Sequence, residues 1–276
     1  GLHWIPPELR EDRGELNWFE SQADMDLVQA DHIKGVIHTH STWSDGKYSI
    51  QEMAEACIAR GYEYLGISDH SKSAGYAGGL SAERVREQWQ EIDGLNESFA
   101  QKGIGFTILK GIESDILSNG DLDYEEDILK GFDFIVASVH QQLDMPLEAM
   151  MNRFQRAIEN PYTTMIGHPT GRLLLKRGES ALNMNELIDQ AAHFHTAIEI
   201  NASPWRLDLD WTWGNKALQS GLFTSINPDA HSIEGIDDIG YGVRIARKAK
   251  FNPKRVLNTL SCAEFVEWAQ QSRELK

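Results

Sequence analysis

Cysteine is scarce in this sequence: Cys57 and Cys262 are the two among 276 residues, and neither has a C-x-x-C partner. This scarcity excludes a disulfide framework and favours a reducing, cytoplasmic compartment. Long apolar runs are also missing, since no stretch approaches the roughly 20 residues that a membrane-spanning helix needs. The start of the chain, GLHWIPPELREDRGE, is polar and contains proline, which argues against a signal peptide or an anchor. We therefore expect no membrane partner.

Positive charge is outnumbered, with 26 Lys and Arg residues against 42 Asp and Glu residues and a formal net charge of −16. A protein that binds nucleic acid through a broad surface normally carries the opposite sign. Any polyanionic substrate must therefore be held by bound metal, by a local basic patch or by another domain. The first apolar run is not followed by G-x-G-x-x-G, which weakens a dinucleotide-binding interpretation.

Seven short apolar runs recur along the chain, at residues 35–40, 64–70, 106–113, 132–140, 163–169, 196–201 and 222–231. Helical patterns lie between them or after them, at residues 50–59, 82–100, 147–159, 185–192 and 263–270. This alternation predicts an α/β fold of parallel βαβ units, as a barrel or as a large doubly wound sheet. Residues 1–30 have no sustained period, so we expect a linker segment there and one folded domain over 31–276.

The ends of the apolar runs carry residue types that bind metals: His38, His40, Asp45, His70, Glu113, His140, His168, Asp229 and His231. Side chains at the carboxyl ends of barrel strands converge on one mouth. Alternate residues of a strand face the same way, so His38 and His40 can both point into it. Nine such groups are too many for one cation and suit a cluster of two or three divalent ions, of which Zn, Mn and Fe fit the ligand types.

Recurrence is what makes these histidines informative, because a single strand-end histidine is more often a structural residue. Six of the ten histidines lie at the strand ends. His193 and His195 form a second H-x-H pair, but they precede the run at 196–201. We therefore expect them at the opposite rim, without a metal.

Six motifs resemble those of the PHP (polymerase and histidinol phosphatase) family: HTHSTWSDG, GISDHS, GIESDIL, VASVH, IGHP and NPDAH. The likeness extends over nearly the whole chain from about residue 31, and all nine ligand positions of the family are filled. It implies a distorted (β/α)7 TIM-like barrel, the PHP fold, over residues 31–276. It also implies a trinuclear centre of Zn, Mn or Fe and the hydrolysis of phosphoric esters.

The resemblance further implies three metal sites, of which the first and the second share Glu113 as a bridge. Their ligands are His38, His40, Glu113 and Asp229 for the first, Glu113, His140 and His168 for the second, and Asp45, His70 and His231 for the third. Glu113, Asp229 and His231 are the catalytic residues to expect. Glu113 would bridge two ions, whereas Asp229 or His231 would orient the nucleophile or serve the leaving group.

Within the family, the segments WIPPELREDRGE, DHIKGVIHTHSTWSDG, HPTGRLLLKRG and YGVRIARKA resemble the C-terminal PHP domain of bacterial family-X DNA polymerases. This branch implies an upstream polymerase region in the native chain and DNA as the phosphoester substrate. The activity to expect is that of a 3′–5′ exonuclease, with 3′-phosphatase or abasic-site endonuclease activity as extensions.

A phosphate substrate also needs cations near the mouth, and Arg can grip it with two hydrogen bonds. The candidates are Arg172, Lys176 and Arg177 in the segment after His168, and Arg206 after the run at 196–201. Trp205, Trp211 and Trp213 follow the same run. They could stack on bases, although packing within the loop is the simpler interpretation.

Two other functions stay open at this point. One is a small-molecule phosphatase of the histidinol-phosphatase type, which the linker-like N-terminal segment argues against. The other is a non-catalytic, metal-stabilised domain that supports a polymerase. Nine ligands argue against it, because structural metal sites are usually closed by four.

Overall fold

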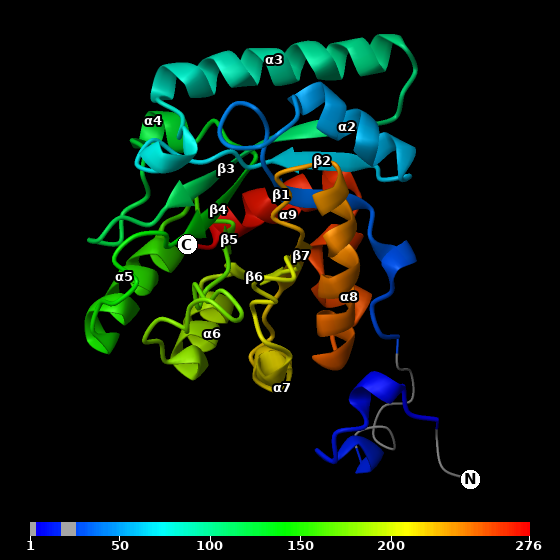
Figure 1. Cartoon of the computed structure of the whole chain (residues 1–276), viewed down its shortest axis with the longest axis vertical. Coiled ribbons are helices and arrows are strands. Elements are labelled where there is room, and N and C mark those ends of the chain that lie inside the picture. The colour runs from blue at the N-terminus through cyan, green and yellow to red at the C-terminus, as the bar shows by residue number, and fades with distance from the viewer. Residues whose placement is uncertain (1–3, 18–25) are drawn as a thin grey trace.

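The computed structural model describes residues 4–17 and 26–276, and its centre is a barrel of parallel strands (Figure 1). In chain order the strands are β1 Gly35–Thr39, β2 Tyr64–Ile67, β3 Thr107–Asp115, β4 Phe134–Ser138, β5 Met165–Ile166, β6 Ala197–Asn201 and β7 Thr224–Asn227. Each strand pairs with the next one along the sequence. A bridge between Thr39 and Ala230, with a 2.8 Å hydrogen bond from the His40 amide to the Ala230 carbonyl, joins the β7 side to β1. The predicted seven-stranded barrel is confirmed.

Helices surround the strands (Figure 1). The α-helices are α2 Ile50–Ala59, α3 Ala82–Gln101, α4 Glu126–Leu129, α5 Leu147–Glu159, α6 Met184–His193, α7 Gly214–Gln219, α8 Ile239–Lys248 and α9 Cys262–Glu274. Short 3-10 turns are η1 Pro7–Leu9, η2 Ala30–His32, η3 Gly75–Ala77, η4 Trp211–Trp213, η5 Glu234–Asp238, η6 Pro253–Arg255 and η7 Leu257–Thr259. Ser49 and Glu52 form a capping box that sets the start of α2. Across the described residues, none of the helices combines the length and the apolarity needed to cross a membrane.

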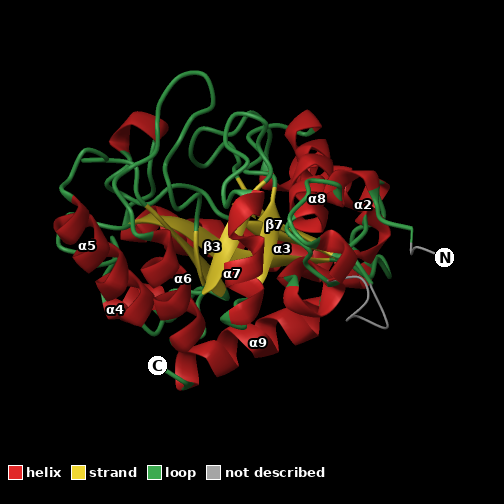
Figure 2. Cartoon of the chain, turned by 90° about the horizontal axis from the view of Figure 1, so that it is seen from below, coloured by secondary structure: helices red, strands yellow, loops and turns green. Residues whose placement is uncertain are grey.

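Helix α9 covers one end of the barrel, and long loops gather at the other end (Figure 2). Phe265 of α9 stacks on Tyr64 at 5.9 Å between ring centroids and meets Phe134 edge-on at 5.8 Å. The Phe134 ring occupies space that side chains on β2 and β3 would need: a Cβ would lie 2.6 Å from it at Gly66 and 2.2 Å from it at Gly111. These glycines let aromatic rings fill this end of the barrel, so the loop end is where a site can form.

The described part of the predicted linker contacts the barrel. Glu8 pairs with Arg247 at 2.7 Å, and Glu11 pairs with Lys248 at 2.6 Å, so residues near the N-terminus are held against α8. Residues 1–3 and 18–25 of that prediction lie outside the described residues. The domain boundary at residue 30 remains a prediction.

Helix α8 is a helix that the sequence analysis missed. It contains Gly240 and Gly242, which lower helix propensity and hide the helical pattern. A Cβ at Gly242 would lie 2.5 Å from Ile226 and 2.7 Å from the Ala202 side chain. Gly242 therefore allows α8 to approach β7 and the end of β6 closely, and this packing outweighs the low propensity.

Candidate metal centre

The nine predicted ligands lie together at the loop end of the barrel. The β1–β7 junction brings His40 Nε2 to 3.2 Å from Asp229 Oδ1, although the two residues are 189 positions apart. Beside them, the His231 ring stacks on His40 at 4.0 Å, and His231 Nε2 lies 3.3 Å from Asp45 Oδ1. Residues that follow the first and the last strand thus form one wall of a shared cluster.

Glu113 of β3 occupies the middle of this cluster and is buried. Its Oε1 lies 2.9 Å from His168 Nε2, 3.2 Å from His140 Nε2 and 3.3 Å from His38 Nε2. Its Oε2 lies 3.0 Å from His70 Nδ1. A carboxylate with imidazole nitrogens around both oxygens is arranged as a ligand that two ions could share.

Three residues of the cluster have left-handed backbone conformations, with φ of 62° at His38, 21° at His168 and 53° at Asp229. Such conformations cost about 1–3 kcal/mol each and persist where the surroundings hold them. The β1–β2 register is irregular between Val36 and Thr39, the stretch that contains His38. His38 and His40 both lie in the cluster, with ring centroids 5.4 Å apart. The direction of the His38 side chain follows from this local irregularity, and regular strand alternation does not account for it.

Three groups of side chains could each hold a cation, with ligand atoms within 4.8 Å of one another. They are His40, Asp45, His70 and His231; His38, His40 and Asp229; and His70, Glu113 and His140. Asp45, His70 and His231 fall together, as the family resemblance implies. His40 and His70 each belong to two groups, and His168 reaches the cluster through Glu113. The division of the ligands among three ions stays a prediction.

The donor atoms of the cluster suit divalent ions. Within the described chain, the buried nitrogens His40 Nδ1 and His168 Nδ1 have no hydrogen-bond partner. Buried polar atoms are rarely left unpaired, and imidazole nitrogen together with carboxylate oxygen is the ligand set that Zn, Mn and Fe accept. The residues present therefore fit bound metal.

The ionisable groups of the cluster influence one another strongly. Burial opposes the charged form of Glu113, but the histidines around it, His140 first, hold its pKa well below the usual range. Burial also opposes charge on His140 and His231, yet neighbouring carboxylates raise the pKa of His140 to about 10 and that of His231 to about 9. Burial and the charges of His231 and His70 lower the pKa of His40 to about 3. Without ions, the protons bound to His140 and His231 offset part of the negative charge of the neighbouring carboxylates.

Metal affinity should therefore rise with pH. A metal binds an imidazole nitrogen that carries no proton, so ions compete with the protons on His140 and His231 at every pH below about 9. We expect the affinity of ion-free protein for Mn²⁺ to increase about tenfold per pH unit for each proton released, between pH 6.5 and 8.5. Calorimetry in two buffers of different ionisation enthalpy measures that release. Binding at pH 7 without proton release would contradict the expectation.

Two buried carboxylates that the sequence analysis did not single out orient these histidines. Glu199 of β6 accepts a 2.6 Å hydrogen bond from His38 Nδ1 and a 3.0 Å bond from the His168 amide. Asp115 lies 2.8 Å from His140 Nδ1. A carboxylate on one ring nitrogen fixes the tautomer and turns the other nitrogen toward a metal. The signal in the sequence is a charged residue inside an otherwise apolar strand, as in AIEIN.

We expect Glu199→Gln to weaken metal binding and hydrolysis by about 10- to 100-fold. The glutamine amide would meet His38 Nδ1 and the Asn227 amide, which now both donate to Glu199. Metal content and kcat/KM, measured on protein with an unchanged circular dichroism spectrum, check the result. Wild-type values for both would contradict an orienting role for this carboxylate.

The four predicted phosphate-binding cations differ in position. Arg206 lies against the cluster, with Nε 3.5 Å from Asp229 Oδ2. Arg177 donates from Nε and Nη2 to the Gly171 carbonyl, at 3.0 and 2.7 Å. Arg172 donates to the carbonyls of Arg206 and Leu207, and it also pairs with Glu179 and Asp210. These contacts join two loops through the Arg172 guanidinium, and its role in binding phosphate stays a prediction.

The aromatic residues near these loops also differ in position. Trp211 and Trp213 pack against the main hydrophobic core, as the simpler interpretation predicted. Trp205 is 53% exposed. Tyr76, which no sequence signal marked, is exposed, and its ring centroid lies 6.2 Å from that of His70. His195 lies away from this mouth, where its carbonyl accepts a hydrogen bond from Ser272 of α9.

Comparison with known proteins agrees with this geometry. The sequence is 45% identical, over 261 residues, to the DNA polymerase/3′-5′ exonuclease PolX of Bacillus subtilis (strain 168). That match covers 95% of this chain but 45% of the relative, so the chain spans less than half of that protein. A probable phosphatase of Thermoanaerobacter sp. (strain X514) is 28% identical over 80% of this chain and 89% of its own length.

A solved structure shares the fold. It is the histidinol phosphate phosphatase of Lactococcus lactis, complexed with zinc, L-histidinol and phosphate. The TM-score is 0.54 at 18% identity, over 77% of this chain and 93% of that one. The sequence model of the PHP domain matches residues 37–203, which include the first seven of the nine cluster residues. The chain belongs to the PHP domain family.

Proposed function

We propose that this metal-dependent phosphoesterase hydrolyses DNA from the 3′ end, as a 3′–5′ exonuclease that can also remove a 3′-phosphate or cut at abasic sites. The observation that carries the proposal is the buried cluster around Glu113, with Arg206 beside it at the open end of the barrel. The relative named as a 3′-5′ exonuclease matches 95% of this chain, which supports DNA as the substrate.

The chemistry follows from the donor set. Two or three divalent ions of Zn, Mn or Fe would supply Lewis acidity and lower the pKa of a bound water. His38, His40, Asp45, His70, Glu113, His140, His168, Asp229 and His231 would hold them. Arg206 would bind a phosphoryl oxygen, because its guanidinium already lies 3.5 Å from Asp229 at the edge of the cluster. Asp229 or His231 would orient the nucleophile or serve the leaving group.

An upstream polymerase region in the native protein is part of the same proposal. The PolX relative is more than twice as long as its match to this chain, which supports such a region. DNA affinity could then reside largely outside the acidic barrel. The scarcity of cysteine supports a cytoplasmic setting.

The test uses three substrates with Mn²⁺ or Zn²⁺: 5′-labelled single-stranded DNA, histidinol phosphate and p-nitrophenyl phosphate. We expect the DNA to shorten from its 3′ end, and the double variant His38→Ala, His40→Ala to lose this activity. Turnover of histidinol phosphate without shortening of DNA would overturn the proposal. Full metal content with no turnover of any substrate would favour a supporting, non-catalytic domain instead.

A small-molecule phosphatase is the second candidate. The observation in its favour is that phosphatase-named relatives match most of their own length, 89% in the Thermoanaerobacter case, with no larger protein around them. The same three substrates decide between the two candidates.

A further inference from the structure

Two loops at the mouth are joined by hydrogen bonds. One follows β5 and the other follows β6. The Leu174 amide donates to the Trp205 carbonyl at 2.7 Å, and Arg172 Nε donates to the Arg206 carbonyl at 2.8 Å. Below them, the buried Asp208 accepts from both the amide and the hydroxyl of Thr170, at 2.9 and 2.8 Å. The backbone that carries Trp205 and Arg206 is therefore fixed relative to the metal centre.

Trp205 and Arg206 are adjacent, but their side chains have different surroundings. Arg206 is 15% exposed and reaches the cluster at Asp229. Trp205 is 53% exposed, although large aromatic side chains are usually well covered by the protein. The indole thus offers an uncovered apolar surface one residue away from the cation that lies on the metal centre.

A second cation lies on the indole. Lys176 Nζ is 4.3 Å from the Trp205 ring centroid, within the range of a cation–π contact. The turn that carries Lys176 is closed by hydrogen bonds between Leu173 and Arg177, at 2.9 Å and 2.7 Å. Leu175, at the tip of this turn, is fully exposed. Proteins that bind single strands without regard to sequence combine aromatic rings, on which bases stack, with positive charge, and Trp205 and Lys176 supply one of each.

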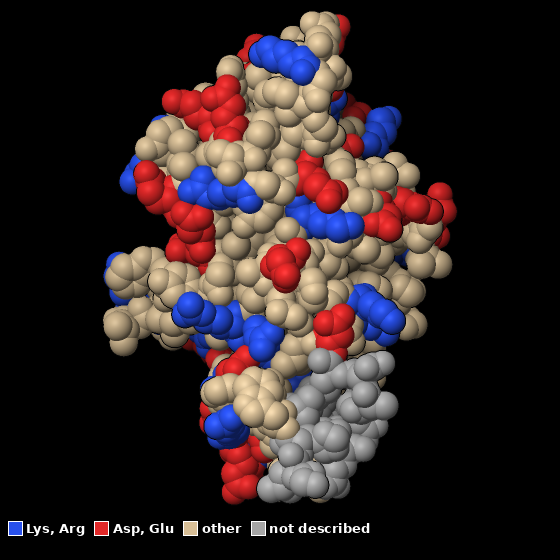
Figure 3. All heavy atoms as spheres, turned by 90° about the vertical axis from the view of Figure 1, so that its right-hand side faces the viewer, with Lys and Arg blue, Asp and Glu red and all other residues tan. Residues whose placement is uncertain are grey.

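The charge distribution makes this position distinctive. The chain carries 42 acidic against 26 basic residues. On the face seen in Figure 3, the described Lys and Arg side chains are interspersed with Asp and Glu and form no continuous basic band. On the two joined loops at the mouth, Glu179 and Asp210 pair with Arg172, and Lys176, Arg177 and Arg206 lie on the same loops as an exposed indole.

We propose that Trp205, with Lys176, is a stacking platform for one nucleobase close to the 3′ end of a DNA strand. The base lies on the indole, and the adjoining phosphate lies toward Arg206 and the metal centre. This inference rests on the proposed exonuclease function and adds to it how the strand end is held. It assigns Trp205 to substrate positioning, not to the chemical step.

The test compares oligonucleotides that differ by one base. Three single-stranded substrates are compared. One has normal nucleotides throughout, and each of the other two has a tetrahydrofuran abasic nucleotide, at the last or at the penultimate position of the 3′ end. Wild type is expected to prefer normal DNA over one of the abasic strands by about 5- to 100-fold in kcat/KM, mainly through KM. Trp205→Ala should reduce that ratio to near one, and Trp205→Phe should keep most of it. Trp4→Ala, an exposed tryptophan on the N-terminal segment, is the matched control and should keep the wild-type ratio.

The outcomes separate the two proposals. A base preference that disappears in Trp205→Ala, with wild-type metal content, supports the platform. DNA shortening whose base preference is the same in wild type and Trp205→Ala overturns the platform and leaves the exonuclease function standing. No DNA shortening by wild type overturns both.

Discussion

Glu113→Gln is expected to lower hydrolysis of every phosphoester substrate by about 1000-fold, because it removes the carboxylate that lies within 3.7 Å of five cluster histidines. The substitution hardly changes volume, but it replaces a charge that the surroundings favour with a neutral amide. Those surroundings hold the pKa of Glu113 well below its usual range, so the ionised form is the one the site is built around. The glutamine NH2 group would also face ring nitrogens that an ion is expected to occupy.

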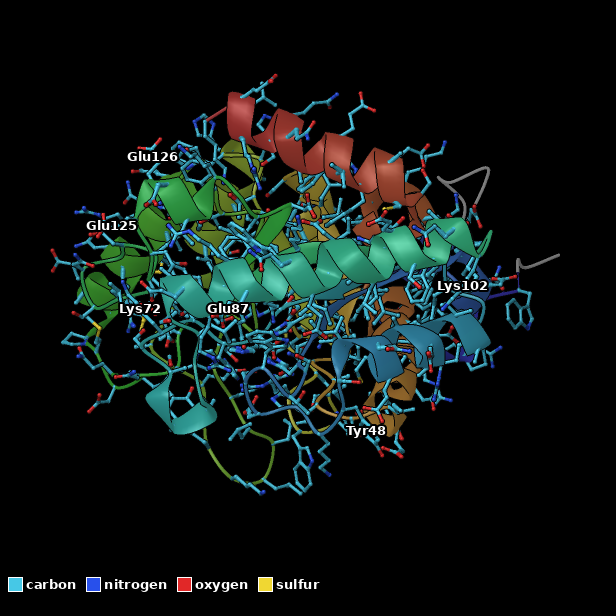
Figure 4. All side chains as sticks on the ribbon, turned by 90° about the horizontal axis from the view of Figure 1, so that it is seen from above. Tyr48, Lys72, Glu87, Lys102, Glu125 and Glu126 are labelled. Atoms are coloured by element: carbon cyan, nitrogen blue, oxygen red, sulfur yellow. The ribbon has the colours of Figure 1, made fainter. Side chains whose placement is uncertain are left out.

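Glu87→Gln is the matched control for this variant. Glu87 is an exposed residue of the outer helix α3 and is labelled in Figure 4. It should retain wild-type kcat/KM and metal content, whereas Glu113→Gln should lose activity together with at least one ion by elemental analysis. Glu113→Gln protein with more than a tenth of wild-type activity would contradict the central role of this carboxylate.

Removing metal with a chelator is expected to lower Tm by roughly 10 °C. The reason is mass action: ions at about 1000 times their Kd stabilise the folded state by about 4 kcal/mol, and each kcal/mol moves Tm by about 2–4 °C in a domain near this size. The effect should grow as pH rises from about 6.5, the ordinary pKa of histidine, to about 9–10. Without ions the protons on His140 and His231 offset the buried carboxylates, and these protons are lost as pH rises through about 9–10.

Calorimetric scans before and after dialysis against a chelator measure this shift, and added Mn²⁺ should restore it. The double variant His38→Ala, His40→Ala serves as the control. Because it lacks two of the expected ligands and should bind fewer ions, its Tm should change little on chelation. Complete removal of ions with an unchanged Tm would show that the cluster contributes nothing to stability when loaded.

Much of the fold could be predicted because its pattern is local. Apolar runs gave all seven strands, and the capping box at Ser49 and Glu52 marks the start of α2 in the sequence itself. The convergence of the strand-end residues followed from barrel geometry. Helix α8 was not predicted, because Gly242 lowers the helix propensity of this segment. The reason for Gly242 is its close tertiary contact with Ile226, which no local pattern can reveal.

The supporting residues of the site were harder to predict. Glu199 is separated by 161 positions from the histidine it orients, and no spacing rule connects them. Arg172 and Arg206 are equivalent loop cations in the sequence. In the structure, the guanidinium of Arg172 donates to backbone carbonyls, whereas that of Arg206 pairs with Asp229 of the cluster. Which way a loop side chain turns depends on partners that lie far apart in sequence.

The junction between β1 and β7 has a consequence for assembly of the fold. It joins the first and the last strand of the sheet through Thr39 and Ala230. In the sequence, Thr39 stands between His38 and His40, and Ala230 stands between Asp229 and His231. The junction therefore brings these two pairs of cluster residues together. An ion held by His38, His40 and Asp229 would link the residues that follow β7 to those of β1. A contact between residues so far apart in the sequence is costly in loop entropy, so we expect the ring of strands to close late in folding.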